Sequence, residues 1–472
     1  MNEIILQLNR DGSDPIYLQI YEEIKNQILN DILHPDRKIP SVRLLSTNLG
    51  VSRNTVETAY ERLLSEGYIY SKARSGYYVQ DLATDVMREK EQVTKKAITS
   101  EIETNSFVTR FDFRGNRVDT TNFPLSIWKK IMNQCLKDQG DELFYFGQPQ
   151  GELGLRKEIA DYLHQARGVR CTEEQIIIGP HSQYLLNLLC QMIGLNGQTI
   201  AFENPGYYAA RQVFRLLGYQ IESIAVDKNG INLDQLHQSN AALAYVTPSH
   251  QIPLGYIMPV QQRLKLIEWA VSGERYIIED DLNSEFRYSG DPIPALQHLD
   301  HHGRVIYMGT FFKSLLPSIR LNYMVLPANL LEIYQVHLSI YQQTTSRVLQ
   351  KTVELFMKEG YWIRHLRRMR KIYKKKFDWT RECIQKYMKD DVTILGDNAG
   401  HHVVVQLNEP KANKDYHSLA MENGIALDSV TQFLDENQTY ENDFHIYMLC
   451  FTALSEEKIE EGIKELSKVW FD

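Results

Sequence analysis

Lys313 stands in the middle of an apolar segment, YMGTFFKSLLPSIRLNYM (residues 307–324), and Arg320 follows it seven residues later. A lone lysine in such a segment usually extends its ammonium group to solvent along the apolar surface. A lysine also has a chemical use, because its amine can condense with an aldehyde to form a Schiff base. The rest of the chain decides between the two roles.

Pyridoxal phosphate (PLP) is an aldehyde cofactor that a lysine holds in this way. It would need a carboxylate for its pyridine nitrogen, an aromatic face for its ring, an anion cup for its phosphate and a donor for its ring oxygen. Candidates for the first three are Asp280 after an apolar run, Tyr207 in the turn ENPGYY, Ser182 and Gln183 after the run IIIG, and Arg320. Each has an ordinary alternative, such as capping, salt bridging or packing, so the hypothesis depends on their joint occurrence.

The segments that carry these residues alternate between apolar β-branched runs and amphipathic helical patterns. The runs include QIIIG, QTIAFE, ALAYVTP, RYIIEDD and RVIYMGT. This alternation predicts an α/β domain with a mostly parallel sheet covered by helices. A parallel sheet presents ligands at the carboxyl ends of its strands, and phosphates lie at helix N-termini, which is where these candidates fall. The stretch ILGDNAGHHVVVQL and a final helical pattern predict a smaller α+β part at the C-terminal end.

The first 80 residues have a different pattern, in which short helices precede two aromatic strands. Ser41 and Ser52 can each cap a helix, and Gly50 closes the turn between the two helices. Residues 68–70 and 77–79 are expected to pair as a two-stranded wing. A helix, a short turn and a second helix form the arrangement that places the second helix in the DNA major groove.

The charge distribution agrees with a local DNA-binding surface. The chain carries a net charge of −8, yet residues 37–80 hold seven Lys or Arg against three Asp or Glu. The run Ser52–Thr55, at the start of the second helix, offers groups that contact bases and phosphates, and Arg43 suits a phosphate. The alternative is a solvated helical hairpin that binds no DNA.

Composition bounds the remaining possibilities. The five cysteines are scattered without a CxxC pair, which favours free thiols over a disulfide framework or a zinc site. No run of about 18 apolar residues is present, so we expect a soluble cytoplasmic protein without a membrane span. Residues 81–106 are polar and lack aromatics, as in a linker. The predicted organisation is a DNA-binding domain over 1–80, a linker over 81–106 and a domain over 107–472, divided at about residue 330.

The N-terminal stretch IPSVRLLSTNLGVSRNTVETAYERLLSEGYI, with RSGYYV, resembles the winged helix-turn-helix of GntR-type bacterial repressors over essentially the whole module. The resemblance implies that the partner is a double-stranded DNA operator. By the same resemblance the expected DNA contacts are Arg43, Ser52, Arg53, Asn54, Thr55 and Gly76.

Residues 107–472 resemble a fold-type I aminotransferase domain, through stretches such as FPLSIW, GQPQGELGLRKEIA, ENPGYY, VTPSHQIPLGYIMP and MGTFFKSLLPSIRLNYMVLP. Joined to the winged helix, the whole chain resembles the MocR/GabR-type transcription regulators. The resemblance implies a PLP site in which Lys313 forms the Schiff base, Asp280 partners the pyridine nitrogen and Tyr207 stacks on the ring. The implied phosphate ligands are Ser182, Gln183, Thr310 and Arg320. His250 and Gln251 lie in the loop that would supply a neighbour to the ring oxygen.

The chain departs from the family pattern at four positions. Leu282 replaces a tyrosine that would donate to the ring oxygen, and Phe312 replaces a serine of the phosphate cup. Ala453 and Ala209 stand where family members carry arginines for a ligand carboxylate. Losing one charged hydrogen-bond partner in a dry pocket costs roughly 1.5–3 kcal/mol, so γ-aminobutyrate and ordinary transamination are disfavoured.

Three hypotheses follow. The first is a regulator whose aminotransferase-like domain senses PLP or a PLP–amine adduct without full transaminase turnover. The second is a working aminotransferase tethered to DNA, which Ala453 and Ala209 disfavour. The third is a regulator whose domain is a PLP-free sensor or dimerisation scaffold, which Leu282 and Phe312 motivate. The family resemblance also implies a homodimer, arranged head-to-tail, with an effector that is PLP or an amine-like molecule.

Overall fold

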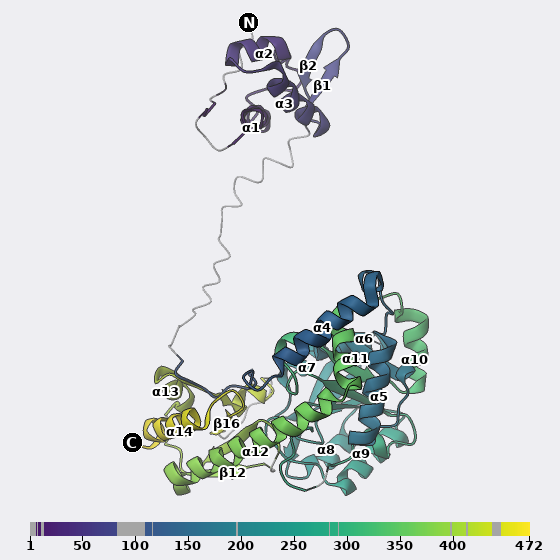
Figure 1. The fold of residues 1–472 in the computed structure, drawn as a ribbon, viewed down its shortest axis with the longest axis vertical. Coiled ribbons are helices and arrows are strands. Elements are labelled where there is room, and N and C mark those ends of the chain that lie inside the picture. The colour runs from purple at the N-terminus through teal and green to yellow at the C-terminus, as the bar shows by residue number, and fades with distance from the viewer. Residues whose placement is uncertain are drawn as a thin grey trace. The chain divides into compact units, whose positions relative to one another are not determined.

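The computed structural model divides into two compact units, Met1–Asn105 and Ser106–Asp472. It describes residues 6, 8–10, 14–82, 109–115, 117–194, 197–282, 284–290, 292–396, 399–411, 414–436 and 445–472. Figure 1 labels many of the helices and several strands of the two units. The predicted linker, residues 81–106, lies outside the described residues from 83 onward.

The first unit is a winged helix-turn-helix. Its elements are α1 (Ile16–Leu29), α2 (Val42–Leu49), α3 (Arg53–Ser65), β1 (Ile69–Lys72) and β2 (Gly76–Val79). The hydroxyl of Ser41 accepts the N–H of Leu44 at 3.2 Å, and that of Ser52 accepts the N–H of Thr55 at 3.2 Å. Because both serines cap the helices that follow them, the predicted helix boundaries are confirmed.

The core of this unit forms where α1 crosses α3. Ile20 and Ile24 of α1 and Val56 and Leu63 of α3 are fully buried. The buried Tyr60 hydroxyl donates to the carbonyl of Pro40 at 2.9 Å, which ties α3 to the residue before the cap of α2. The apolar faces of the two helices therefore pack against each other, and the opposite face of α3 stays in solvent.

The second unit is built on an eight-stranded sheet with the order β4-β11-β10-β9-β8-β5-β6-β7. The strands are β4 (Ile176–Gly179), β5 (Thr199–Asn204), β6 (Gln220–Asp227), β7 (Gly230–Ile231), β8 (Leu243–Val246), β9 (Tyr276–Asp281), β10 (Val305–Thr310) and β11 (Asn322–Val325). Pairing is parallel from β10 through β6, whereas β11 runs antiparallel to both of its neighbours. The five apolar runs in the sequence correspond to β4, β5, β8, β9 and β10, which confirms the mostly parallel sheet.

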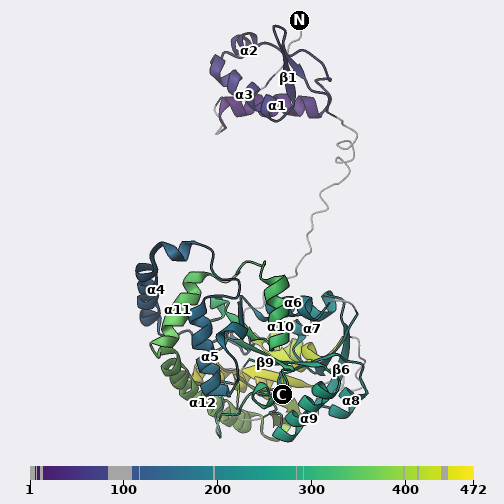
Figure 2. The ribbon, with the colours of Figure 1, turned by 90° about the vertical axis from the view of Figure 1, so that its right-hand side faces the viewer.

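Helices cover both faces of this sheet, as Figure 2 shows. One face packs against α6 (Ser182–Ile193), α7 (Tyr208–Leu216) and α10 (Ala328–Ile333). The other face packs against α5 (Leu153–Arg167), α8 (Leu233–Gln238), α9 (Val260–Ser272), α11 (Arg347–Lys358) and α12 (Tyr361–Tyr387). Burial on both faces explains why these strands are continuously apolar.

A smaller α+β part follows. Its antiparallel sheet has the order β12-β13-β16-β15, from β12 (Val392–Leu395), β13 (His402–Leu407), β15 (Asp428–Ser429) and β16 (Ile446–Cys450). The helices α13 (Tyr416–Glu422) and α14 (Glu456–Phe471) accompany it. The strand β3 (Phe111–Asp112), from the start of the unit, pairs in parallel with β14 (Ile425–Ala426). Among the described residues, no helix is long and apolar enough to cross a membrane.

Candidate functional site

Asp280 lies near the carboxyl end of β9, in the middle of the sheet, and is buried. It accepts a hydrogen bond from the hydroxyl of Tyr245, which comes from the neighbouring parallel strand β8. Burial raises the pKa of Asp280 from 3.8 to about 7, and the nearby charges of Asp281 and Glu279 add to the rise while the Tyr245 bond opposes it. Asp280 is therefore a carboxyl group that a cationic ring nitrogen would ionise.

Tyr207 links Asp280 to the start of α6. The residue is partly buried and immediately precedes α7. Burial raises the pKa of Tyr207, the charge of Asp280 raises it further, and a hydrogen bond with Ser182 lowers it. Asp280, Tyr207 and Ser182 thus lie in one cluster, although they are far apart in the sequence.

The antiparallel strand β11 completes the candidate phosphate cup. Its first residue, Asn322, is in register with Thr310 of β10 on one side and with Gly179 of β4 on the other. The side chains of Asn322 and Thr310 form a hydrogen bond at 3.0 Å, and in the amide orientation that satisfies all of its neighbours the Asn322 oxygen accepts the N–H of Ser182 at 3.1 Å. Sheet pairing therefore joins Thr310 to the N-terminus of α6, where an anion would be favoured.

Arg320 and Gln183 lie beside the same helix end. His181 caps α6, because its Nδ1 accepts the N–H of Tyr184 at 3.2 Å. Burial lowers the pKa of His181, the positive charge of Arg320 lowers it further, and a hydrogen bond with Gln183 raises it. Arg320 is exposed, with a left-handed φ of 51°. The exposed guanidinium thus adds positive charge to the end of α6.

Lys313 follows β10 by three residues and is partly buried. Its Nζ donates to the carbonyl of Gly115, and the ring of Phe312 lies 5.1 Å from Nζ. Burial lowers the pKa of Lys313, whereas the neighbouring Cys450 and Asp428 raise it. Within the described residues, the hydrogen bond of Nζ goes to Gly115 and none goes to Asp280.

His250 and Gln251 are buried and have structural partners. His250 Nε2 lies 3.2 Å from the carbonyl of Ala399, and its ring packs edge-on against His402. The amide nitrogen of Gln251 donates to the carbonyls of Pro205 and Ile252, each at 2.8 Å. The side-chain contacts of both residues join loops to one another, and Tyr245 supplies a hydroxyl beside Asp280. That His250 or Gln251 neighbours the ring oxygen stays a prediction.

Three residues of this site had weak signals or none in the sequence. Tyr245 and Asn322 are polar groups within apolar strand runs, ALAYV and LNYMV, and that pattern could have marked them. Asp428 accepts the N–H of Gly115 at 2.8 Å and lies close to Lys313. Gly115 and Asp428 are 313 positions apart in the sequence, so no local pattern connects them.

The structure shows the surroundings of two of the four positions that differ from the family pattern, Ala453 and Ala209. Ala453 is exposed and lines a cavity of about 750 Å³, together with Asp119 and Lys376. Lys376 Nζ lies 3.0 Å from Asp119, so this buried cation already has its counter-ion. Ala209 lies within the first turn of α7. Lys376 is therefore not available as a free carboxylate clamp beside Ala453.

The candidate DNA contacts lie on one unit and are mostly exposed. Arg53 and Asn54 begin α3 and are exposed, while Thr55 is partly buried and its N–H and hydroxyl bond to Ser52. Arg43 is exposed on α2. In the wing, Gly76 has a φ of 116°, which a residue with a side chain rarely adopts. A capped helix N-terminus with exposed Arg and Asn side chains suits contact with phosphates and base edges.

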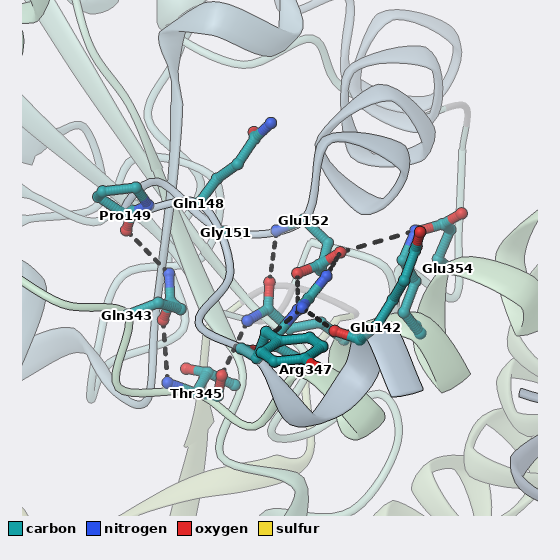
Figure 3. Close-up of polar contacts among 12 residues, drawn as sticks. Glu142, Gln148, Pro149, Gly151, Glu152, Gln343, Thr345, Arg347 and Glu354 are labelled. Carbon is teal, nitrogen blue, oxygen red and sulfur yellow. Dashed lines mark hydrogen bonds and ion pairs between the residues drawn. The ribbon is translucent and has the colours of Figure 1, made fainter. Parts of the chain in front are cut away.

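A second polar cluster, shown in Figure 3, holds the segment GQPQGE in place. Glu152 forms an ion pair with Arg347 at 2.6 Å, and its N–H donates to Gln350 at 2.8 Å. The amide of Gln343 donates to the carbonyl of Pro149 at 3.1 Å. The cluster therefore fastens the loop before α5 to the segment that leads into α11.

This fastened loop follows a run of exposed aromatic side chains. Phe144, Tyr145 and Phe146 have exposed fractions of 76%, 71% and 88%. The carbonyl of Tyr145 accepts a hydrogen bond from Arg347 at 3.0 Å, so the backbone beneath the aromatic rings is held. Large apolar side chains displayed on a fixed loop are typical of an interaction surface.

Comparison with known families identifies both units. Residues 16–79 match the family model for bacterial regulatory proteins of the gntR family. Residues 113–466 match the model for aminotransferase class I and II. A solved structure of Pyrococcus horikoshii kynurenine aminotransferase is similar in fold, with a TM-score of 0.67 and 26% identity over 82% of this chain and 95% of that one. Fold and site together define a DNA-binding protein fused to an aminotransferase-like domain.

Two curated relatives cover nearly the full length. The HTH-type transcriptional regulator YdeL of Bacillus subtilis is 40% identical, over 98% of this chain and 98% of its own length. The probable rhizopine catabolism regulatory protein MocR of Rhizobium meliloti is 30% identical, over 98% of this chain and 95% of its own. The chain therefore belongs to the MocR-type transcription regulators of the GntR family.

Proposed function

We propose that this regulator binds PLP at Lys313 and that the state of this site controls its binding to a DNA operator. The observation that carries the proposal is the cluster of Asp280, Tyr207 and Ser182 at the carboxyl edge of a parallel sheet. Lys313 follows the adjacent strand β10. The same chain presents a capped helix with exposed Arg53 for DNA.

The chemistry of the donor set fits PLP. When bound, PLP supplies an aldehyde for a lysine amine and an electron-withdrawing pyridine ring. Asp280 would hold the proton of the ring nitrogen, and Tyr207 would cover one face of the ring. Burial lowers the pKa of Lys313, which keeps more of the amine uncharged and nucleophilic near neutral pH. The phosphate would be bound by Ser182, Gln183, Thr310 and Arg320.

The proposed site does not carry out full transamination. Turnover of an amino acid needs a cation that orients its carboxylate, and Ala453 and Ala209 supply none. Lys376, beside Ala453, is paired with Asp119. The proposed effector is PLP itself or an amine that reacts with it, recognised without an arginine clamp at these two positions.

We also propose a homodimer, arranged head-to-tail as in the resemblance. The support is the exposed run from Phe144 to Phe146, displayed on the loop that Arg347 and Glu152 fasten. A second copy would bury these rings, which otherwise leave a large apolar surface in water. The operator would then contain two half-sites separated by whole helical turns, about 10 bp or a multiple.

The test is a PLP titration of the purified full-length chain, followed by visible absorption and by retardation of its own upstream DNA. Lys313→Ala and the charge-preserving Lys313→Arg serve as matched variants. We expect a visible absorption band and a change in operator affinity with PLP in the native chain and in neither variant. Operator binding without any PLP-dependent band would contradict the proposal and leave a PLP-free regulator, in line with Leu282 and Phe312.

A further inference from the structure

Residues 110–115, called here the entry segment, lie at the start of the second unit, whose described part begins at residue 109. The chain continues from their N-terminal side to the winged helix. The N–H of Arg110 donates to Gly424 at 2.8 Å, and the N–H of Phe113 donates to Ala426 at 2.7 Å. The carbonyl of Phe113 accepts from Cys450 at 2.8 Å. The entry segment is thus fastened as an added strand to the C-terminal part of the unit.

The C-terminal end of the entry segment contacts the candidate cofactor lysine. Gly115 uses both of its peptide groups, because its carbonyl accepts from Nζ of Lys313 and its N–H donates to Asp428 at 2.8 Å. A Cβ atom at Gly115 would lie 3.6 Å from the Asp428 carboxylate and 4.0 Å from Nζ, so the three groups lie close together. A hydrogen bond from an ammonium group is among the stronger ones in proteins.

We propose that the free ammonium group of Lys313 is a tether for the entry segment, and that reaction of Lys313 with an aldehyde releases it. The inference rests on the proposed function, because it takes Lys313 as the residue that engages the cofactor. It adds a physical connection: occupancy of the cofactor site changes how firmly the entry segment is held, and the chain continues from this segment toward the DNA-binding unit. This connection passes through the backbone of Gly115.

The chemistry of the amine explains the release. The ammonium first loses one proton to solvent, and the free amine then forms a C=N double bond with the aldehyde carbon. The aldehyde oxygen leaves as water with the two remaining N–H protons, so atoms and charge balance. As the unprotonated imine, the nitrogen carries no N–H, so the Gly115 carbonyl loses its donor.

The test is amide hydrogen exchange of the full-length chain, measured by mass spectrometry on peptides that cover residues 110–118. Lys313→Met removes the donor and keeps the apolar stem, and Lys374→Met is a matched surface control. We expect exchange in the entry segment to be roughly tenfold faster in Lys313→Met than in the native chain, both without PLP. PLP should accelerate exchange in the native chain and leave Lys313→Met unchanged.

The outcomes separate the tether from the proposed function. If absorption shows no engagement of PLP, the proposed function fails, and the comparison of Lys313→Met with the native chain still decides the tether. If absorption shows full engagement but exchange in the entry segment does not change, the tether fails alone. Equal exchange in Lys313→Met and the native chain without PLP also overturns it. Asp428→Asn keeps an acceptor for Gly115 but removes the charge beside Nζ, so an intermediate rate is expected.

Discussion

At the scale of single residues, the candidate site is marked by several buried carboxyl groups. Burial raises the pKa of Glu203, Glu279 and Asp280 to about 7 in each case. The neighbouring Asp281 forms an ion pair with Arg167 at 2.8 Å. These three carboxyl groups bind protons more tightly in the folded chain than in the unfolded one. A cationic ring beside Asp280 would stabilise its ionised form and offset part of the cost of burying that charge.

Asp280 should therefore make the cofactor-free chain less stable as the pH rises. Its folded pKa of about 7 lies above the ordinary value of 3.8, so its contribution to stability is complete below about pH 4 and is lost as the pH passes through 7. We expect the fall in melting temperature between about pH 5 and pH 8 to be smaller in Asp280→Asn by roughly 2 °C or more. Calorimetry at several pH values measures it, and an unchanged fall would contradict the assignment.

At the scale of elements, the turn between α2 and α3 sets the angle of the recognition helix. Gly50 has a φ of 64°, a left-handed conformation that closes α2 and lets Ser52 begin α3 two residues later. The N–H of Gly50 donates to the carbonyl of Thr47 at 3.4 Å, and Val51 N–H donates to Ser46 at 3.0 Å. The guanidinium of Arg10 caps the same helix end through the carbonyl of Leu49 at 2.8 Å.

Replacing Gly50 should destabilise this turn through backbone conformation. Gly50→Ala places a Cβ in the left-handed region at a cost of about 1 kcal/mol, whereas Gly50→Asn is better tolerated there. Hydrogen exchange of the α2 and α3 amides in the full-length chain should be faster in the alanine variant than in the asparagine variant. The new Cβ would lie 3.3 Å from the Arg10 guanidinium. If the alanine and asparagine variants lose protection from exchange equally, the destabilisation comes from the contact of the new Cβ with Arg10 and not from backbone conformation.

The helices and strands of this chain were predictable from sequence where the residues that determine them lie close together along the chain. Serine caps, a closing glycine and apolar runs define α2, α3 and the parallel strands within a few residues of chain. The contact of Lys313 with Gly115 was not predictable, because it depends on how β3 pairs with β14. Asn322 joins Thr310 to Ser182 only because β11 runs antiparallel between β10 and β4. Sequence patterns alone do not determine such long-range pairing.

At the scale of the whole molecule, charge is unevenly divided. The chain carries −8, yet Lys38, Arg43, Arg53, Lys72 and Arg74 are exposed on the winged helix. An acidic protein with a basic surface on one unit should bind DNA through few phosphate contacts and weakly elsewhere. The salt dependence of operator binding then gives the number of these phosphate contacts.

Arg43→Gln should reduce that salt dependence without changing which operator is preferred. Each lost phosphate contact lowers the slope of log affinity against log salt by about 1, so a dimer should lose about 2 and a monomer about 1. Fluorescence anisotropy of the operator at several salt concentrations gives the slope. Lys458→Gln, an exposed lysine on α14, is the control and should leave the slope unchanged. An Arg43 variant with the native slope would exclude a phosphate contact at this position.

The order of strands also has a consequence for biosynthesis. The winged helix closes its core within about 60 residues, whereas β4 must wait for β11, whose pairing joins Ile176 to Val325. Domains near the N-terminus fold first during translation, and pairing between distant segments is slow. The nascent chain can therefore complete its DNA-binding unit before any phosphate cup exists. Under the proposed function, ribosome-bound chains would carry an operator-binding surface before the candidate cofactor site could control it.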